Sequence, residues 1–254
     1  MKITTIKTNP VLANDDLFAL FDKYLPAMIP EKSVLAVTSK IVALCEGRVA
    51  DPTKHNRDEL VVQESSYYIP KKYNKYGFCL SIKNHTLIAS AGIDESNGDG
   101  NFVLWPADPQ KSANQIRSYI RQKWSLSEFG VVMTDSHILP MRWGTQGTAI
   151  AYSGFQPLKN YIGLPDIFNR KLKVTRANHT EGLAASAVLC MGEGDEQTPL
   201  ALITDLDFIK FVEPDPSDDE LIMMRNSLED DVYAPLLVNA KWKVGGEKSK
   251  WLNK

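Results

Sequence analysis

The stretch Thr86-Leu87-Ile88-Ala89-Ser90-Ala91-Gly92-Ile93-Asp94-Glu95-Ser96-Asn97 joins an apolar run to a cluster of polar and small side chains. Residues 86–89 have the composition of a buried strand. Two carboxylates and a carboxamide leave that strand together, and the glycine-containing loop 98–101 follows. Carboxylate oxygens beside a flexible backbone suit a divalent metal or a metal-bound phosphate. The stretch therefore predicts a strand with a binding site at its end.

Two other apolar runs end in the same way. Residues 34–37 lead into Thr38-Ser39-Lys40, and residues 130–134 lead into Asp135-Ser136-His137. Carboxylates from the ends of different strands can meet in space, and Mg²⁺ needs only one or two of them besides water and substrate phosphates. Lys40 can bind a phosphate as a point charge, or the segment can simply begin a solvated helix. Asp135 can likewise be an ordinary cap or turn residue.

The order of the predicted elements decides the fold class. Strands are expected over residues 2–7, 34–37, 86–89, 102–105, 130–134 and 199–203. Helices are expected after the N-cap segment 14–16, after Pro109, around residues 183–189 and after the start residues Asp215 and Ser217. These strands do not alternate regularly with long helices as a doubly wound fold requires, so we predict an α+β fold with mixed, largely antiparallel sheets. The polar segment 51–74 is expected to be a surface segment, a subunit contact or a mobile flap.

Two of the predicted helices carry further expectations. After Pro109, apolar residues at helical spacing form a core stripe, while Arg117 and Arg121 are expected elsewhere on the surface. The helix around residues 183–189 is apolar nearly all round and is therefore expected to be buried. It runs into Gly192-Glu193-Gly194-Asp195-Glu196, whose carboxylates either hold a cation or face solvent.

The segment 142–154 is rich in glycine and threonine and begins with an arginine. Arg142 can clamp a phosphate or a carboxylate with two parallel hydrogen bonds. The alternative is a β-hairpin that binds nothing. The glycine spacing matches neither a Walker loop nor a dinucleotide-binding fingerprint, so those two nucleotide-binding classes are not indicated.

Composition excludes several classes of function. The chain of 254 residues has 29 basic and 31 acidic side chains, so no global field favours a nucleic acid or an anionic membrane. No apolar run approaches the ~20 residues of a membrane span, and the beginning lacks the pattern of a signal peptide, so a cytoplasmic protein is expected. Cys45, Cys79 and Cys190 are odd in number and widely spaced, which predicts buried, reduced thiols rather than disulfides or a zinc ribbon. The final Lys-Trp-Lys-rich stretch, residues 241–254, is expected to be a frayed end.

Several of these segments, taken together, resemble the gamma-glutamyl ligase family of coenzyme F-420 biosynthesis. They are Thr38-Ser39-Lys40-Ile41-Val42 with Glu46-Gly47-Arg48, residues 90–97, Pro106-Ala107-Asp108-Pro109 with Ser112-Ala113 and Ile116-Arg117, Thr134-Asp135-Ser136, residues 142–150, and Leu189-Cys190-Met191-Gly192-Glu193. The resemblance covers roughly residues 1–205. The combination is specific, whereas no single motif is.

The resemblance implies an enzyme that attaches L-glutamate through an amide to an acidic precursor, using GTP (or ATP) and Mg²⁺ or Mn²⁺, and that forms homodimers. It implies a catalytic domain over residues 1–210, built of two intimately associated subdomains, and an acidic helical extension with a tail over residues 211–254. Neither a nucleic acid nor a membrane is an expected partner. Carried over to matching positions, the implied metal ligands are Asp94, Asp135, Ser136 and Glu193. The implied nucleotide contacts are Ser39, Lys40, Asn97, Gly192, Gly194 and Asp195, and the catalytic candidates are Arg142 and Asp135.

The chain also departs from the family pattern. Residues 135–140 read Asp-Ser-His-Ile-Leu-Pro where the family commonly has Asp-Thr-x-Gly-Arg-Pro, Leu44 replaces a second lysine, and Glu181-Gly182 replaces an acidic pair. Two cations are therefore absent from a phosphate-rich site. This leaves the acceptor open between an F-420-0-like and a folate-like molecule. A metal-dependent phosphohydrolase and a non-catalytic nucleotide-binding protein remain the alternatives.

Overall fold

A five-stranded sheet forms the centre of the computed structural model, which describes residues 1–247. Its strands, in spatial order, are β1 (Lys2–Ile6), β12 (Leu200–Thr204), β2 (Ser33–Thr38), β8 (Phe129–Ile138) and β9 (Thr145–Ser153). Only β2 and β8 pair in parallel, and the other neighbours are antiparallel. The prediction of an α+β protein with mixed, largely antiparallel sheets is confirmed.

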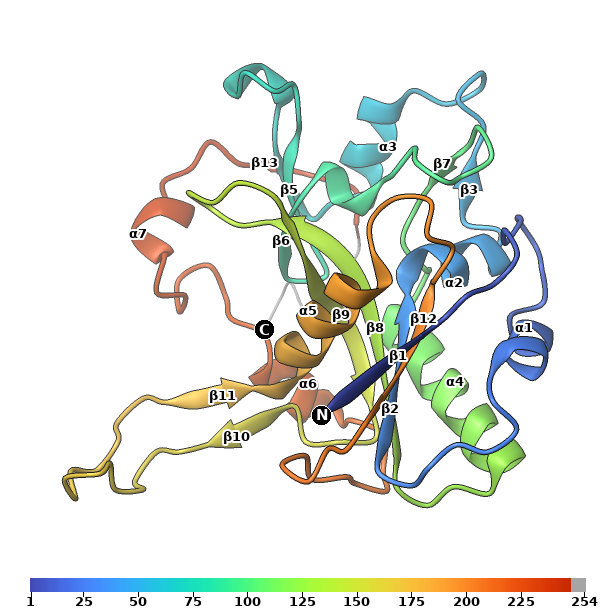
Figure 1. Ribbon diagram of the computed structural model, residues 1–254. Helices are drawn as coiled ribbons and strands as arrows, with labels where there is room; N and C mark the ends of the chain where they lie inside the picture. The colour runs from blue at the N-terminus through green and yellow to red at the C-terminus, as the bar shows by residue number, and fades with distance from the viewer. Residues whose placement is uncertain (248–254) are drawn as a thin grey trace.

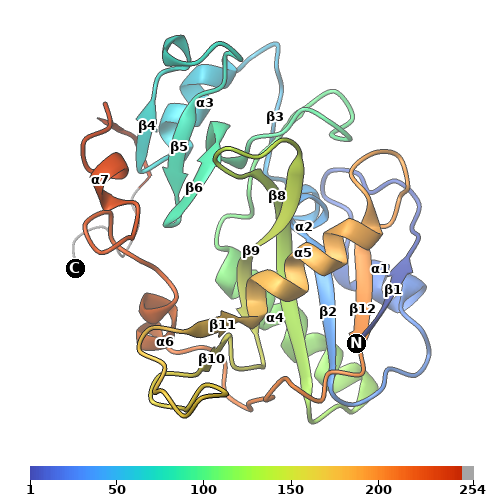
Figure 2. The ribbon, with the colours of Figure 1, turned by 60° about the vertical axis from the view of Figure 1, so that its left-hand side comes forward.

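Helices cover both faces of this sheet (Figures 1 and 2). α1 (Leu17–Tyr24), α2 (Ser39–Cys45) and α4 (Pro109–Trp124) pack on one face, and α5 (His179–Met191) packs on the other. Side chains alternate along β2, so Leu35 belongs to the first core cluster and Val34 to the second. A strand that is buried on both faces reads as a continuous apolar run, which explains the sequence of β2.

A second, four-stranded sheet lies beside the central one (Figure 2). Its order is β13 (Lys243–Val244), β4 (Tyr67–Ile69), β5 (Leu80–Lys83) and β6 (Thr86–Ala89). α3 (Arg57–Glu64) and the short turn helix η1 (Lys71–Tyr73) complete the layer, and β3 (Val49–Ala50) pairs with β7 (Phe102–Val103). Leu60 and Val61 are buried in its core. Most of residues 51–74 are exposed or half-buried, as expected for a surface segment, and they include the folded elements α3, β4 and η1.

Two further parts extend from this body. β10 (Leu158–Asn160) and β11 (Arg176–Asn178) form a long hairpin arm that projects away from the central sheet (Figure 1). α6 (Asp218–Met223) and α7 (Ala234–Leu237) come after β12, the last strand of the central sheet in sequence order. α6 begins at the predicted start residue Ser217, which forms a capping box with Glu220. The final stretch was expected to fray from residue 241, yet Lys243 and Val244 pair with β4; its residues 248–254 lie outside the described residues.

Three surface expectations are wrong. Arg117, expected on the surface, is 3% exposed, and its guanidinium donates to the Phe129 carbonyl at 3.0 Å and to Asp215 at 3.1 Å. α5 was expected to be buried all round, yet Leu189 is 85% exposed because the helix packs on the sheet with one side only. Cys190, on that same outer side, is exposed, so the three thiols are free but not all buried.

Candidate active site

The parallel pairing of β2 with β8 places two of the motifs side by side. Thr38 pairs with Thr134, so the residues that follow them, Ser39 with Lys40 and Asp135 with Ser136, leave the same edge of the pair. The sequence suggested that this strand ends at Thr134, but β8 does not end there. It continues to Ile138 along β9, where Asp135 pairs with Thr148, and the pairing skips one residue of β9 between Met133 and Thr134. Asp135 therefore projects from within a strand, next to a bulge that redirects the chain.

The turn after β6 places the third motif. In η2 (Ser90–Gly92) all three residues have positive φ, at 52°, 53° and 70°. Two of them are not glycine, and such backbone strain persists only where the surrounding structure enforces it. Here the Ala91 N–H donates to the Ser81 hydroxyl at 2.7 Å. The turn delivers Asp94 to the site, where its backbone pairs with Val103.

A cavity of about 530 Å³ opens where these segments meet. Its wall combines the segment 8–12, the start of α2, the loop after η2, β8 and the loop 192–199 between α5 and β12. The predicted site residues that line it are Ser39, Lys40, Asp94, Asn97, Asp135, Ser136, Gly192, Glu193, Gly194 and Asp195. Apolar side chains, among them Val11, Leu44 and Met191, contribute the remaining surface. The cavity thus offers both charged and apolar contacts to one ligand.

Lys40 and Asp94 form an ion pair in this cavity. The ammonium of Lys40 lies 2.6 Å from the Asp94 carboxylate, 3.0 Å from the Ser96 carbonyl and 3.1 Å from the Ser96 hydroxyl. Burial opposes the charge on Asp94, but the hydrogen bonds from Lys40 and Ser96 outweigh it and lower the pKa of Asp94. Both side chains keep contact with solvent, at 26% and 47% exposure. They can therefore exchange this pairing for a ligand.

Asp135 is held more tightly. One oxygen accepts a hydrogen bond from the Ser136 backbone N–H at 2.8 Å, and the other accepts one from the indole N–H of Trp105. Burial raises the pKa of Asp135 to about 6, against the opposing effect of these donors and of Lys40, and the charge of Asp94 raises it further. Asp94 and Asp135 are thus close enough to influence each other's charge.

The loop after α5 closes the cavity from the opposite side. The Ser136 hydroxyl lies 2.8 and 2.7 Å from the two carboxylate oxygens of Glu193. The Asn97 side chain donates to the Gly194 carbonyl at 3.1 Å, which links this loop to the one that carries Asp94. Gly192 has a φ of 83°, and a Cβ there would lie 2.3 Å from the Glu196 carboxyl carbon. Only glycine fits that turn.

The oxygen donors of the cavity suit a hard cation whose coordination shell is completed by oxygens of the substrate. Within residues 1–247, no three His, Cys, Asp or Glu side chains converge as a ready-made metal cage. Mg²⁺ usually binds through one or two carboxylates plus water and substrate phosphates, and Mn²⁺ also prefers oxygen ligands. Asp94 and Asp135 supply two such carboxylates, and Ser136 with Glu193 supplies further oxygens. The residues therefore fit either ion in the presence of a phosphate ligand.

Two residues of the motifs lie outside the cavity. Arg142 sits in the exposed tip between β8 and β9, where its guanidinium donates to the neighbouring Met141 carbonyl at 3.0 Å. Glu95, next to Asp94 in sequence, turns to Arg57, with their side chains 3.2 Å apart. The segment 142–154 contains the single strand β9, which forms a hairpin with β8, and its Gly147 lets α5 pack closely, since a Cβ there would lie 2.6 Å from Val188.

Sequence reasoning missed two contributors to the site. Trp105 was expected only as a strand residue, and no local pattern indicates that its indole reaches a carboxylate 30 positions away. Ser96 lies in the motif but was given no role, although it joins Lys40 and Asp94. The serine two residues after an aspartate could have indicated this local bond, because such side chains often bond to nearby groups.

Comparison with known proteins gives the same family throughout. Residues 5–205 match the family model described as F420-0:Gamma-glutamyl ligase. The chain is 30% identical to the coenzyme F420:L-glutamate ligase of Methanosarcina mazei, over 72% of this chain and 80% of that protein. It is 29% identical to that of Methanopyrus kandleri, over 77% and 83%, and 27% identical to that of Methanocaldococcus jannaschii, over 76% and 84%.

These comparisons agree with the motifs on which the resemblance rests, from residues 38–48 to residues 189–193. A search of the helices within residues 1–247 finds no segment that is long and apolar enough to cross a membrane. The relatives are named as ligases. The chain belongs to the F420-0:gamma-glutamyl ligase family, and it is a ligase.

Proposed function

We propose that this enzyme forms an amide between L-glutamate and the carboxylate of an acidic acceptor, either F-420-0-like or folate-like, and that it consumes GTP (or ATP) with Mg²⁺ or Mn²⁺. The observation that carries the proposal is the single cavity that Lys40, Asp94, Asp135 and Ser136 line together. The names of the relatives support the glutamate and the F420-type acceptor. The loss of two cations, at Leu139 and at Leu44, is the reason to keep a folate-like acceptor open.

The proposed role of each residue follows from the chemistry of its side chain. Asp94, Asp135, Ser136 and Glu193 would hold the metal, which when bound neutralises phosphate charge and lets two anionic substrates approach. Lys40 would exchange its pairing with Asp94 for a phosphate oxygen, because its ammonium is a mobile point charge. The nucleotide contacts that we propose are Ser39, Asn97 and the turn residues Gly192, Gly194 and Asp195.

The proposed reaction has two steps because a carboxylate does not react with an amine at neutral pH. An oxygen of the acceptor carboxylate attacks the γ-phosphorus, the bond to the nucleoside diphosphate breaks, and an acyl phosphate forms. The glutamate amine then attacks the acyl carbon, the amide bond forms, and phosphate leaves as the amine loses its proton. No covalent bond to the protein is needed. The protein's part is to position the groups and to stabilise charge.

We further propose that the enzyme works as a homodimer in the cytoplasm. The exposed apolar residues of the hairpin tip support a partner there, since Met141 is 95% and Trp143 is 91% exposed. Arg142 lies between them and would meet an anionic substrate only when this tip is covered by the second copy. Residues 1–210, as two associated subdomains, would form the catalytic unit, with 211–254 as its extension.

The test is an incubation of the protein with Mn²⁺, GTP or ATP, L-glutamate and either F-420-0 or a folate, followed by mass spectrometry of the acceptor. We expect a glutamylated acceptor and phosphate in equal amounts, each dependent on all components. With oxygen-18 in the acceptor carboxylate, one labelled oxygen should appear in the released phosphate. Phosphate release without acceptor and glutamate would instead indicate a phosphohydrolase, and nucleotide binding without turnover would indicate a non-catalytic nucleotide-binding protein.

A further inference from the structure

Trp105 lines a second cavity, of about 760 Å³, and its indole also contacts Asp135, a residue that lines the candidate active site. Its side chain is 1% exposed and is part of the main core cluster. The only polar atom of the ring, the indole nitrogen, is directed to Asp135 in the first cavity, while the ring also lines the second. An indole N–H is a donor only, so this contact is always made to an oxygen lone pair of Asp135.

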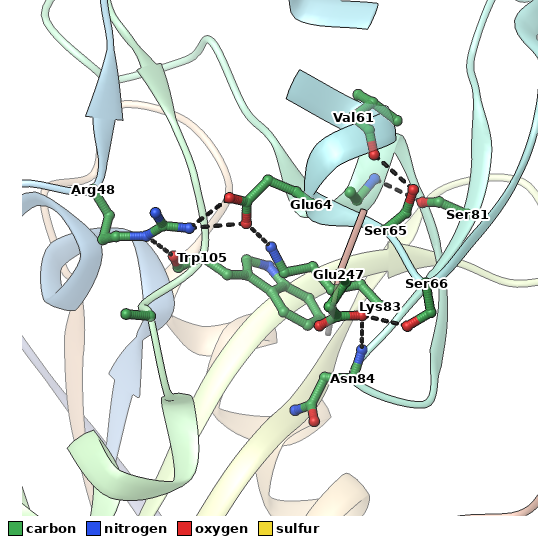
Figure 3. A network of polar contacts seen from close by, with 12 residues as sticks. Arg48, Val61, Glu64, Ser65, Ser66, Ser81, Lys83, Asn84, Trp105 and Glu247 are labelled. Atoms are coloured by element: carbon green, nitrogen blue, oxygen red, sulfur yellow. Dashed lines mark hydrogen bonds and ion pairs between the residues drawn. The ribbon is translucent and has the colours of Figure 1, made fainter. Parts of the chain in front are cut away.

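The surroundings fix the position of this indole. Arg48 donates from its Nε to the Trp105 carbonyl at 3.1 Å, and the ammonium of Lys83 lies over the ring, 5.7 Å from its centroid (Figure 3). Glu64 holds both cations by accepting hydrogen bonds from Arg48 and Lys83. Trp105 is thus held through its backbone and one ring face by an ion network that lies outside the active site.

A glycine makes the contact to Asp135 possible. Gly92, in the strained turn η2, has a φ of 70°, and a Cβ built there would lie 2.2 Å from the indole nitrogen. Any side chain at this position would displace the N–H. The same turn delivers Asp94, so the geometry of one proposed metal ligand is tied to the hydrogen bond on the other.

We propose that Trp105 is a positioning residue for the metal site: it holds the carboxylate of Asp135 in one orientation, ready to bind the cation together with Asp94. The inference rests on the proposed function, because it assumes that Asp135 binds a metal. Groups that orient metal ligands from outside the coordination sphere change metal affinity by about 10–100-fold when they are removed. Trp105 does not touch the reacting atoms, so its effect must pass through Asp135.

The test measures the binding of Mn²⁺ alone, by electron paramagnetic resonance, to the wild type and to a Trp105→Phe variant, which keeps an aromatic ring but loses the donor. We expect about tenfold weaker Mn²⁺ binding and unchanged binding of GTP in metal-free buffer. Replacement of Trp105 by benzothienylalanine, which has sulfur in place of the N–H, should weaken Mn²⁺ binding equally while preserving the ring. Trp124→Phe is the matched control, because its indole donates to the Pro26 carbonyl at 2.9 Å instead.

The outcomes separate this inference from the proposed function. Unchanged Mn²⁺ affinity in a folded Trp105→Phe protein, alongside a clear loss in Asp135→Asn, would overturn the role of Trp105 alone. Wild-type Mn²⁺ affinity in Asp135→Asn would overturn the metal site itself, and the inference with it. If Trp105→Phe fails to fold, the Mn²⁺ affinity of the benzothienylalanine protein tests the role of Trp105 instead, and an unchanged affinity would overturn it. Equal weakening in Trp124→Phe would show a general effect of stability and would also contradict the proposal.

Discussion

The candidate active site and the second cavity, which Trp105 lines, contain the same kinds of charged group but differ in how far these groups are exposed to solvent. In the first, Lys40 and Asp94 pair with their side chains 26% and 47% exposed. In the second, the side chain of Lys83 is 7% exposed, and Lys83 shares Glu64 with Arg48. A buried ion pair that is fully hydrogen-bonded resists rearrangement, whereas a partly solvated pair can exchange partners at little cost. We infer that the second cavity supports the site, and that the first binds the ligand.

The largest effect is expected at Asp94. Asp94→Asn removes a proposed metal ligand and should lower kcat/KM in the ligase assay by at least about 100-fold, because metal stabilisation of phosphate charge contributes several kcal/mol. Glu95→Gln is the matched control, since its neighbouring carboxylate turns to Arg57. Comparable losses in both variants would contradict the assignment of Asp94.

Lys83 and Lys40 should differ in what they stabilise. Lys83→Met leaves Glu64 in a poorly solvated place with Arg48 as its remaining partner. We expect the free energy of unfolding to fall by about 3 kcal/mol, at the low end for a broken buried pair. Lys40→Met should cost far less stability but raise the KM for the nucleotide. Urea denaturation and steady-state kinetics of both variants measure the two effects. A larger loss of stability in Lys40→Met, with a raised nucleotide KM in Lys83→Met, would contradict this prediction.

The pH dependence of stability should reveal the buried charge of Asp135. Its pKa of about 6 in the folded protein lies above the ordinary value of 3.8. Its favourable contribution is therefore fully present below about pH 4 and is lost as the pH rises through 6. In metal-free buffer, Asp135→Asn should match the wild type near pH 4 and be more stable near pH 7, by on the order of 1–3 kcal/mol.

Denaturant unfolding at the two pH values provides the measurement. The exposed Glu193 offers the control, because Glu193→Gln removes no desolvated charge. A difference between Asp135→Asn and the wild type that stays constant from pH 4 to 7 would show that Asp135 is not desolvated as described.

The smallest effect is expected at the hairpin tip. Arg142→Ala alters an exposed side chain outside the cavity, so stability should change by less than about 0.5 kcal/mol. If the tip meets a second copy, the KM for the acceptor should rise severalfold while the KM for the nucleotide stays the same. Steady-state kinetics in which each substrate is varied in turn measure the KM for the acceptor and the KM for the nucleotide separately. A rise confined to the nucleotide KM would move Arg142 away from the acceptor.

The sequence was sufficient to place the carboxylates but not their partners. Asp94 and Asp135 each follow an apolar run, and this local signal was enough to single them out as candidates, although Asp135 lies within β8 and not at its end. Their meeting depends on the parallel register of β2 with β8 and on the turn η2, which no local pattern specifies. The chain-distant contact from Trp105 could not be predicted for the same reason.

The errors have equally physical causes. β8 runs past Thr134 because its antiparallel partner β9 continues to pair with it after the parallel one ends. Arg117 is buried because a carbonyl and Asp215 satisfy its guanidinium, whereas helical spacing alone makes it look like Arg121, a surface residue. Leu189 is exposed although its helix is apolar, since only one side of α5 meets the sheet. In each of these three errors, contacts with segments distant in the sequence determined the outcome.

We propose that the first cavity holds the metal and the nucleotide together. A crystal of this protein soaked with Mn²⁺ and a non-hydrolysable GTP analogue, measured for the anomalous signal of manganese, tests it most directly. We expect a manganese peak within bonding distance of Asp94 and Asp135 and next to the nucleotide phosphates, with Lys40 released from Asp94. A nucleotide bound elsewhere, or manganese bound away from both carboxylates, would contradict it.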